Sequence, residues 1–139
     1  MNKKAIPSFI LTVAVFGIFG FFVNYQLTKM GNVAITEMVL NHARALETGN
    51  EELLTSLLHP DVVFAYPGRR LNKEQTLEDL RFFRDAYTDT KVYIHTVIIH
   101  GDNVAVEWQF ATTKKNTGKR EAVSDAIIGK IQDGKFIVW

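Results

Sequence analysis

Residues 91–113 read KVYIHTVIIHGDNVAVEWQFATT, two runs of alternating side chains on either side of a Gly-Asp-Asn turn. In a β-strand successive side chains point to opposite faces of a sheet, so a period of two predicts a long antiparallel hairpin. One side of the second run is wholly apolar and is expected to be buried. Its members are Val104, Val106, Trp108 and Phe110.

The strands on either side extend this pattern. The alternation continues into residues 119–132 and, after Asp133-Gly134, into a last strand that ends at Trp139. Residues 62–65 predict a further short strand, followed by a turn at Tyr66-Pro67-Gly68. The sequence therefore predicts a curved antiparallel sheet.

The helical signals come earlier in the chain. Residues 33–48 carry apolar side chains at three- and four-residue spacing, which predicts an amphipathic helix. Asn50 can cap a second short helix that ends before Pro60, and Asn72 to Gln75 resembles a capping box that begins a third. Three helices packed on such a sheet give an α+β, cone-shaped domain with room for a cavity between the layers.

A different kind of segment precedes this domain. Residues 5–23 carry no charge, and about 19 residues in a helix span roughly 28 Å, the thickness of a bilayer core. Residues 1–30 are therefore predicted to be a single transmembrane anchor, and residues 31–139 the domain. A signal peptide is the main alternative, but the segment lacks a small-x-small cleavage site. A soluble buried helix would need more polar residues at helical spacing.

Charge places the anchor and limits the partners. Lys3 and Lys4 precede the apolar segment and only Lys29 follows it closely, so the positive-inside rule puts the N-terminus in the cytoplasm and the domain on the outer side. Gly17, Gly20, Phe21 and Phe22 offer a surface on which a neighbouring membrane helix can pack.

A net charge of +1 gives no basic face for nucleic acid, and the absence of cysteine rules out thiolate metal sites.

The residues from Ala43 onward resemble the nuclear transport factor 2-like superfamily, and within it the SnoaL-like polyketide cyclases and ketosteroid isomerases. The resemblance is carried by the motifs ARALETGN (43–50), LLHPDVVF (57–64), YPG (66–68) and QDGKF (132–136). It implies the cone fold but not a particular activity, because members include enzymes, ligand binders and assembly modules. Members usually continue beyond the Asp-Gly-Lys turn for longer than this chain does, so the chain is truncated or its last strand is short.

The positions that the isomerase-like members use for catalysis are altered here. The resemblance implies an acidic base before Pro67, where this chain has Tyr66, and a tyrosine at the position of His42. An acidic residue is implied at the position of Ile127, and Asp125 lies two residues earlier on the same face. Isomerase chemistry of that type is therefore not expected.

His42 and Asp125 are nevertheless the candidate acid–base pair, because imidazole titrates near neutrality and a carboxylate on an apolar strand face needs a partner. Tyr66, Trp108, Phe110 and Ile127 are candidate ligand-binding residues. A structural role is the alternative for each of these residues. His42 could be a hydrogen-bonded core histidine, Tyr66 a tyrosine that simply packs, and Trp108 and Phe110 ordinary core aromatics. Arg69 and Arg70 could rim the cavity, although solvation explains them equally well. His95 and His100 fall on opposite strand faces, so no metal site and no cofactor is predicted.

Two functions remain open. The altered positions and the anchor favour an accessory or scaffolding subunit without catalysis of its own, associated with the bilayer and with other membrane subunits or a second copy. The alternative is an enzyme or small-molecule binder of the isomerase, cyclase or hydrolase kind, acting on a hydrophobic ligand in the cone cavity. An open cavity reached by both His42 and Asp125 would favour the alternative, and a filled one the subunit.

Overall fold

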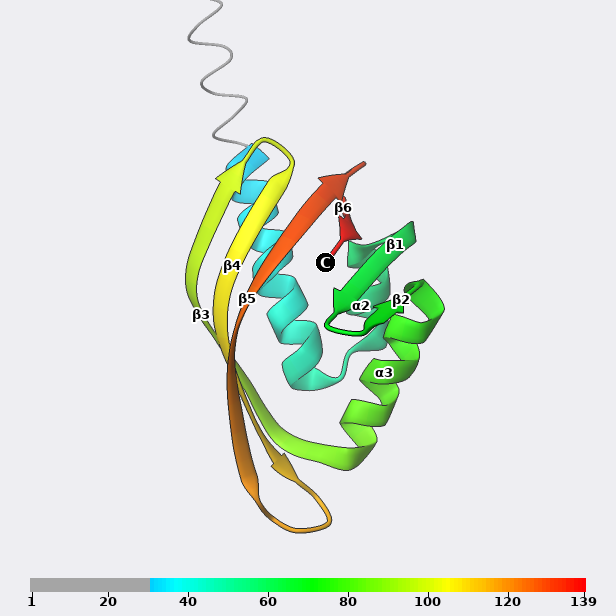
Figure 1. The fold of residues 1–139 in the computed structure, drawn as a ribbon, viewed down its shortest axis with the longest axis vertical. Helices are drawn as coiled ribbons and strands as arrows, with labels where there is room; N and C mark the ends of the chain where they lie inside the picture. Colours follow the sequence, from blue (N-terminus) through cyan, green and yellow to red (C-terminus); the bar gives the residue numbers. More distant parts are fainter. Residues whose placement is uncertain (1–30) are drawn as a thin grey trace, which may run out of the picture. The chain divides into compact units, whose positions relative to one another are not determined.

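A computed structural model describes residues 31–139 of the chain. Its six strands form one sheet in the order β2-β1-β6-β5-β4-β3. The strands are β1 (Leu58–Tyr66), β2 (Arg69–Leu71), β3 (Tyr87–His100), β4 (Asn103–Lys114), β5 (Arg120–Gln132) and β6 (Lys135–Val138). The expected hairpin is confirmed, since β3 pairs antiparallel with β4 along almost its whole length, and β4 pairs with β5 in the same way. Figure 1 shows these three strands bending strongly along their length.

The sheet is mixed, which corrects the prediction of an antiparallel one. Strand β6 returns beside β1 in the parallel sense, with Leu58 opposite Phe136 and Val63 opposite Val138. The backbone of Trp139 extends this pairing, because its N–H donates to Val63 O (3.0 Å) and its carbonyl accepts from Ala65 N (2.8 Å). Parallel pairing joins segments that are far apart in the chain, so local alternation does not reveal it.

Strand β1 is longer than expected and includes Pro60. The register between β1 and β6 shifts between Leu58 and Val63, and a proline that cannot donate to the ladder is tolerated at such an irregularity. Strand β3 also begins earlier than expected, at Tyr87. Its register shifts between Thr88 and Lys91, where Asp89 has a positive φ of 51°, so the regular alternation starts only afterwards.

Three helical segments pack with this sheet, as expected. Residues 31–48 are helical, and α2 (Glu51–Leu57) and α3 (Lys73–Ala86) follow. Both predicted caps are confirmed: Asn50 Oδ1 accepts from Leu53 N (2.9 Å), and Asn72 exchanges two hydrogen bonds with Gln75 in a capping box.

The core lies between the helices and the inner face of the sheet. It is formed by apolar side chains from every layer, among them Val39, Leu54, Leu58, Val62, Val104, Val106 and Phe136. Burial of this set supplies the main stabilising term of the domain. Residues Ala34–Trp139 make up one compact unit.

The predicted membrane anchor falls on residues 1–30, outside the described part of the chain, as do Gly17, Gly20, Phe21 and Phe22. Within residues 31–139, no helix combines the length and the apolar character needed to cross a bilayer.

Candidate functional site

A pocket of about 250 Å³ opens between the end of β1 and strands β4, β5 and β6, and residues from both faces of β5 line it. We call it the Trp108 pocket. Its wall is formed by Phe64, Ala65, Tyr66, Pro67, Trp108, residues 125–128, Val138 and Trp139. Ligand pockets commonly measure about 300 to 1,000 Å³, so this pocket lies just below that range and has room only for a small molecule.

Pairing of β4 with β5 brings Trp108 and Asp125 together. The two residues are directly opposite each other in the antiparallel register, so their side chains share one face of the sheet. Trp108 is buried, whereas Asp125 is exposed. Asp125 forms no hydrogen bond or ion pair with any side chain in residues 31–139. Asp125 therefore shares a face with the buried Trp108 while its own side chain is exposed.

Tyr66 and Ile127 also line the pocket. The Tyr66 ring packs against Phe64 with 5.0 Å between ring centroids, and its hydroxyl donates to Asp79 Oδ2 at 3.5 Å. Partial burial raises the pKa of Tyr66, and the negative charge of Asp79 raises it further. The phenol is therefore protonated at neutral pH, with its proton directed at Asp79.

His42 is not part of this pocket. Its side chain is only 1% exposed, and its ring is surrounded by Phe64, Trp108, Phe136 and Trp139 at centroid distances of 4.9–6.4 Å. Desolvation by burial lowers the pKa of His42 to about 3, so the imidazole is neutral at physiological pH. The predicted His42–Asp125 pair is therefore corrected: the two groups do not reach a common cavity, because aromatic rings fill the space around the histidine.

Phe110 lies away from the pocket as well. Its ring contacts Phe83 of α3 at 5.0 Å, and Phe83 in turn stacks on Tyr87. The structure thus places four of the predicted residues, Tyr66, Trp108, Asp125 and Ile127, at the pocket wall. Phe110 lies elsewhere, and His42 packs against the Trp108 ring without lining the pocket.

The arginines after the turn do not line the pocket either. Arg69 forms an ion pair with Asp79 (3.4 Å), and Arg70 borders a separate open depression beside β2. Both the apolar wall and the lack of a basic side chain favour an uncharged occupant.

Trp139 is the pocket residue that sequence reasoning missed. Its ring is 3% exposed and lies 4.3 Å from Phe136 and 4.9 Å from His42, measured between ring centroids. Gly129 makes room for it: a Cβ at this position would come within 2.6 Å of the Trp139 ring. A glycine on the predicted buried face of β5 was the available signal, because it marks a close approach of another group.

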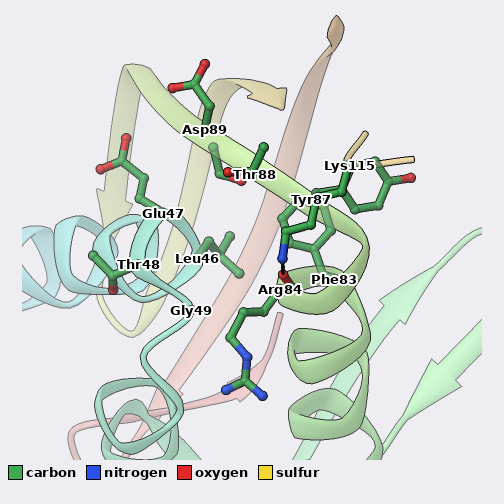
Figure 2. A pocket seen from close by; sticks show the side chains of 11 residues that line it. Leu46, Glu47, Thr48, Gly49, Phe83, Arg84, Tyr87, Thr88, Asp89 and Lys115 are labelled. Atoms are coloured by element: carbon green, nitrogen blue, oxygen red, sulfur yellow. Dashed lines mark hydrogen bonds between the residues drawn. The ribbon is translucent and has the colours of Figure 1, made fainter. Parts of the chain in front are cut away.

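A second depression, which we call the Lys115 groove, lies where the helix of residues 31–48, α3 and β3 meet. Figure 2 shows Arg84, Lys115 and Tyr87 around it. Lys115 Nζ donates to the Arg84 carbonyl (2.8 Å), and Lys115 N donates to Ala86 O (3.0 Å). A lysine that satisfies the last carbonyls of a helix has a structural explanation, so this groove is assigned to capping of α3.

Within residues 31–139, no three His, Cys, Asp or Glu side chains are grouped so that they could hold a metal ion. What the Trp108 pocket can offer is an apolar, aromatic enclosure with one unpaired carboxylate at its wall.

The profile of the SnoaL-like domain family matches residues 39–139. The chain belongs to the SnoaL-like domain family. A comparison with curated protein sequences found no match.

Solved structures share this SnoaL-like fold at low sequence identity. TsrD from Streptomyces laurentii is 18% identical, with a TM-score of 0.69, over 76% of this chain and 84% of that one. An epoxide hydrolase of the LEH-like kind from M. tuberculosis is 20% identical, with a TM-score of 0.68, over 77% and 80% of the two chains. A proposed polyketide cyclase from Xanthomonas campestris pv. campestris is 18% identical, with a TM-score of 0.68, over 76% and 86%. At such identities the likeness shows the fold alone.

Proposed function

We propose that the domain binds a small, uncharged, largely apolar molecule in the Trp108 pocket and takes a proton from it with the Asp125 carboxylate. The observation that carries the proposal is the unpaired carboxylate of Asp125 at the wall of an otherwise apolar, aromatic pocket. Carboxylates that serve as general bases act on a substrate within hydrogen-bond reach, and such catalysis contributes about 10²- to 10⁴-fold to the rate.

The comparisons support this proposal over a purely scaffolding role. Proteins of the same fold are named as an LEH-like epoxide hydrolase, a proposed hydroxylase and a proposed polyketide cyclase. The cavity criterion by itself favours the accessory subunit, because His42 and Asp125 share no open cavity. The names of the fold neighbours favour the enzyme or binder, and the proposal follows them together with the Trp108 pocket.

His42 takes no part in the proposed proton transfer. A neutral, enclosed imidazole packs as an aromatic ring, and its contacts with Trp108 and Trp139 hold the inner wall of the pocket in place. The proposed roles are then Asp125 as base, Trp108 and Ile127 as walls, and Tyr66 as the rim residue.

Binding is tested by the fluorescence of the chain's two tryptophans, since both Trp108 and Trp139 line the pocket. Titration with bicyclic molecules such as indene and 1-indanone is expected to change the emission and to saturate. Ile127→Phe, which adds bulk to the wall, should abolish the response. The matched control is Ile98→Phe, the same substitution on β3 at a side chain that is 63% exposed. Saturable binding that Ile127→Phe leaves intact would place the ligand elsewhere.

The base is tested by hydrogen exchange of 1-indanone in D₂O. Asp125 takes a proton from C2, the electron pair of that C–H bond moves toward the carbonyl, and a deuteron returns to C2. Wild-type protein should accelerate the loss of the C2 proton signal, and Asp125→Asn should remove about 99% or more of the acceleration. Asp102→Asn, which changes an exposed carboxylate in the β3–β4 turn, is the control. Exchange that Asp125→Asn leaves unchanged would refute the proposed base.

We also propose that residues 5–23 hold the domain at a bilayer, with the domain on the outer side. The support is the uncharged apolar composition of the segment and the two lysines before it. A bilayer also concentrates the hydrophobic molecules that the pocket suits. Fractionation tests this proposal: the full chain should stay in the membrane pellet after an alkaline carbonate wash, and protease added outside intact cells should digest residues 31–139. Recovery in the soluble fraction would contradict it.

One observation keeps a protein partner as a second candidate function. Ile98 and Ile128 flank Ala105 on the outer face of the sheet, and they are 63% and 77% exposed. Two isoleucines side by side in water favour burial against another surface, and the occupant we propose is a second copy of this chain. Light scattering tests it: the chain should have the mass of a dimer, and Ile128→Lys the mass of a monomer. A monomeric wild-type chain would exclude this candidate.

A further inference from the structure

Strand β5 has an edge that no other strand covers along most of its length. Strand β4 pairs with β5 from Arg120 to Lys130, whereas β6 pairs only with the last residues of β5, from Lys130 to Gln132. Figure 1 shows β5 running well beyond the short β6. Within residues 31–139, no strand therefore pairs with residues 120–129 of β5 on the side of β6.

The ladder between β4 and β5 shows which backbone groups this edge presents. Ile131 N donates to Asp102 O (2.8 Å) at one end of the ladder. At the other end, Lys114 N donates to Lys119 O (3.0 Å). Such bonds recur at every second residue of an unbroken antiparallel pair, so the odd-numbered residues of β5 bond β4 and the even-numbered ones point to the opposite edge. The open edge, which we call the β5 edge (residues 122–128), thus presents the N–H and C=O groups of Ala122, Ser124, Ala126 and Ile128.

The Trp108 pocket lies along the β5 edge. Residues 125–128 line it with side chains from both faces of the strand, as expected where the edge of a sheet is open, and the end of β1 forms the other side. Because β6 lies between β1 and β5 in the sheet, the space beyond β6 has the width of one strand. The backbone of Trp139 leaves the β5 edge free, since its N–H and its carbonyl both bond β1.

The side chains of the β5 edge give little protection against the addition of a strand. Sheet edges are usually protected by lysine, proline or a bulge. Residues 122–128 (AVSDAII) contain neither lysine nor proline, and their register with β4 has no shift. Residues 122–126 are all exposed, although their side chains alternate between the two faces. The one protecting feature is the inward-facing charge of Asp125, which disfavours an apolar or acidic residue opposite it.

We infer that the β5 edge binds an extended segment of a partner polypeptide, which adds to β5 as an antiparallel strand in the line of β6. Side-chain alternation defines the segment: a basic residue lies opposite Asp125, and apolar residues two positions to either side lie opposite Val123 and Ile127. The inference goes beyond the proposed function, since a strand at this edge would cover the Trp108 pocket and exclude a small ligand.

Charge favours a foreign segment over a second copy of β5. Asp125 forms no hydrogen bond or ion pair with any side chain in residues 31–139, so its carboxylate is available to a basic side chain. If two β5 strands paired antiparallel through their open edges, Asp125 would face an inner-face residue of the other copy. The inner-face positions from Glu121 to Ile131 hold Glu, Val, Asp, Ile, Gly and Ile, and none is basic. Such a pair would leave the carboxylate without a counterion.

The test uses the full chain labelled with ¹⁵N and a seven-residue peptide, TVTKTVT, capped at both ends. Its lysine lies opposite Asp125 when its two valines lie opposite Val123 and Ile127. We expect the peptide to slow amide exchange at Ser124 and Ala126, whose N–H groups become bonded. The amides of Val123 and Asp125, which already bond β4, should change little. Unchanged exchange at Ser124 and Ala126 throughout the titration would overturn the inference.

Modified peptides provide matched controls. N-methylation of the fifth residue, the threonine opposite Ser124, removes a donor to β5 and should weaken binding about tenfold or more. N-methylation of the sixth residue, the valine opposite Val123, should weaken binding much less, because that N–H points away from β5. TVTETVT, which places a glutamate opposite Asp125, should bind about fivefold more weakly than TVTKTVT. Equal affinity of the two methylated peptides, or of the lysine and glutamate peptides, would overturn the inference.

Asp125→Lys reverses the charge of an exposed side chain and should reverse this preference, so that TVTETVT binds more tightly than TVTKTVT. Asp102→Lys, the same change in the β3–β4 turn, should keep the preference of the wild-type chain. A preference that Asp125→Lys leaves unchanged would place the peptide elsewhere and overturn the inference. None of these measurements uses a small ligand, so their results do not depend on the proposed function.

Discussion

Acidification should destabilise this domain through a single residue, His42. The pKa of the imidazole is about 3 in the folded protein and 6.5 as a free side chain, because burial among aromatic rings removes the water that would solvate its charge. Between these two pH values the unfolded chain binds a proton that the folded protein does not. Stability therefore falls as the pH falls, starting near pH 6.5.

The size of the effect follows from the difference in pKa. Each pH unit well between the two values is worth about 1.4 kcal/mol of unfolding free energy, so the His42 contribution reaches about 2 kcal/mol at pH 5 and about 4 kcal/mol at pH 3. The interval from pH 7.5 to pH 5 is the useful one. Ion pairs lower the pKa of the half-buried carboxylates Glu51 and Glu121 from the ordinary value of 4.5, so these groups titrate only below this interval.

Urea titrations of the full chain at pH 7.5 and pH 5 measure this difference. Wild-type protein should lose about 2 kcal/mol between the two conditions. His42→Leu, which has a similar volume and cannot titrate, should lose much less, whatever its absolute stability. His100→Gln, at an exposed histidine, should behave like wild type. Equal losses in wild type and His42→Leu would refute the reasoning, because the pH dependence would then come from other groups.

Three further changes probe how the site is supported. Gly129→Ala should lower the unfolding free energy by about 1–3 kcal/mol and alter the tryptophan emission, because the new methyl group would overlap the Trp139 ring; an unchanged spectrum would contradict the packing. Asn72→Ala removes the capping box of α3 and should cost about 1 kcal/mol in thermal unfolding, whereas full stability would mean that the cap is dispensable. Lys115→Met keeps the aliphatic stem but loses the bond to Arg84 O, so amide exchange should accelerate in the last turn of α3 while the fold persists; unchanged exchange there would show that the bond does not cap the helix.

The parts of the fold that depend on local pattern could be predicted. The alternation in residues 91–113 identifies β3 and β4, and the side-chain oxygens of Asn50 and Asn72 mark the starts of α2 and α3. Pairings between distant segments could not be predicted in this way. Strand β6 joins β1 across about 75 residues of chain, and neither strand contains a signal that names its partner.

The predictions for the site divide in the same way, between features that local pattern reveals and contacts between distant segments that it does not. Register and alternation place Trp108, Asp125 and Ile127 on one face of the sheet, and the structure agrees because these residues belong to neighbouring strands. His42 also faces inward as its helical spacing predicts. Whether an inward-facing side chain lines an open cavity or is packed over depends on side chains from other strands and helices, which local spacing does not reveal. Here Phe136 of β6 and Trp139, which follows β6, pack against the imidazole of His42.

Trp139 connects the fold to the proposed chemistry. Its backbone extends the parallel ladder with β1, and its ring fills the space between His42, Phe136 and Gly129. The ring thereby removes the imidazole from the pocket and forms part of the wall that remains, next to Trp108. The proposed base therefore has no histidine partner in the pocket. The proposed proton transfer rests on Asp125 rather than on a histidine–carboxylate pair.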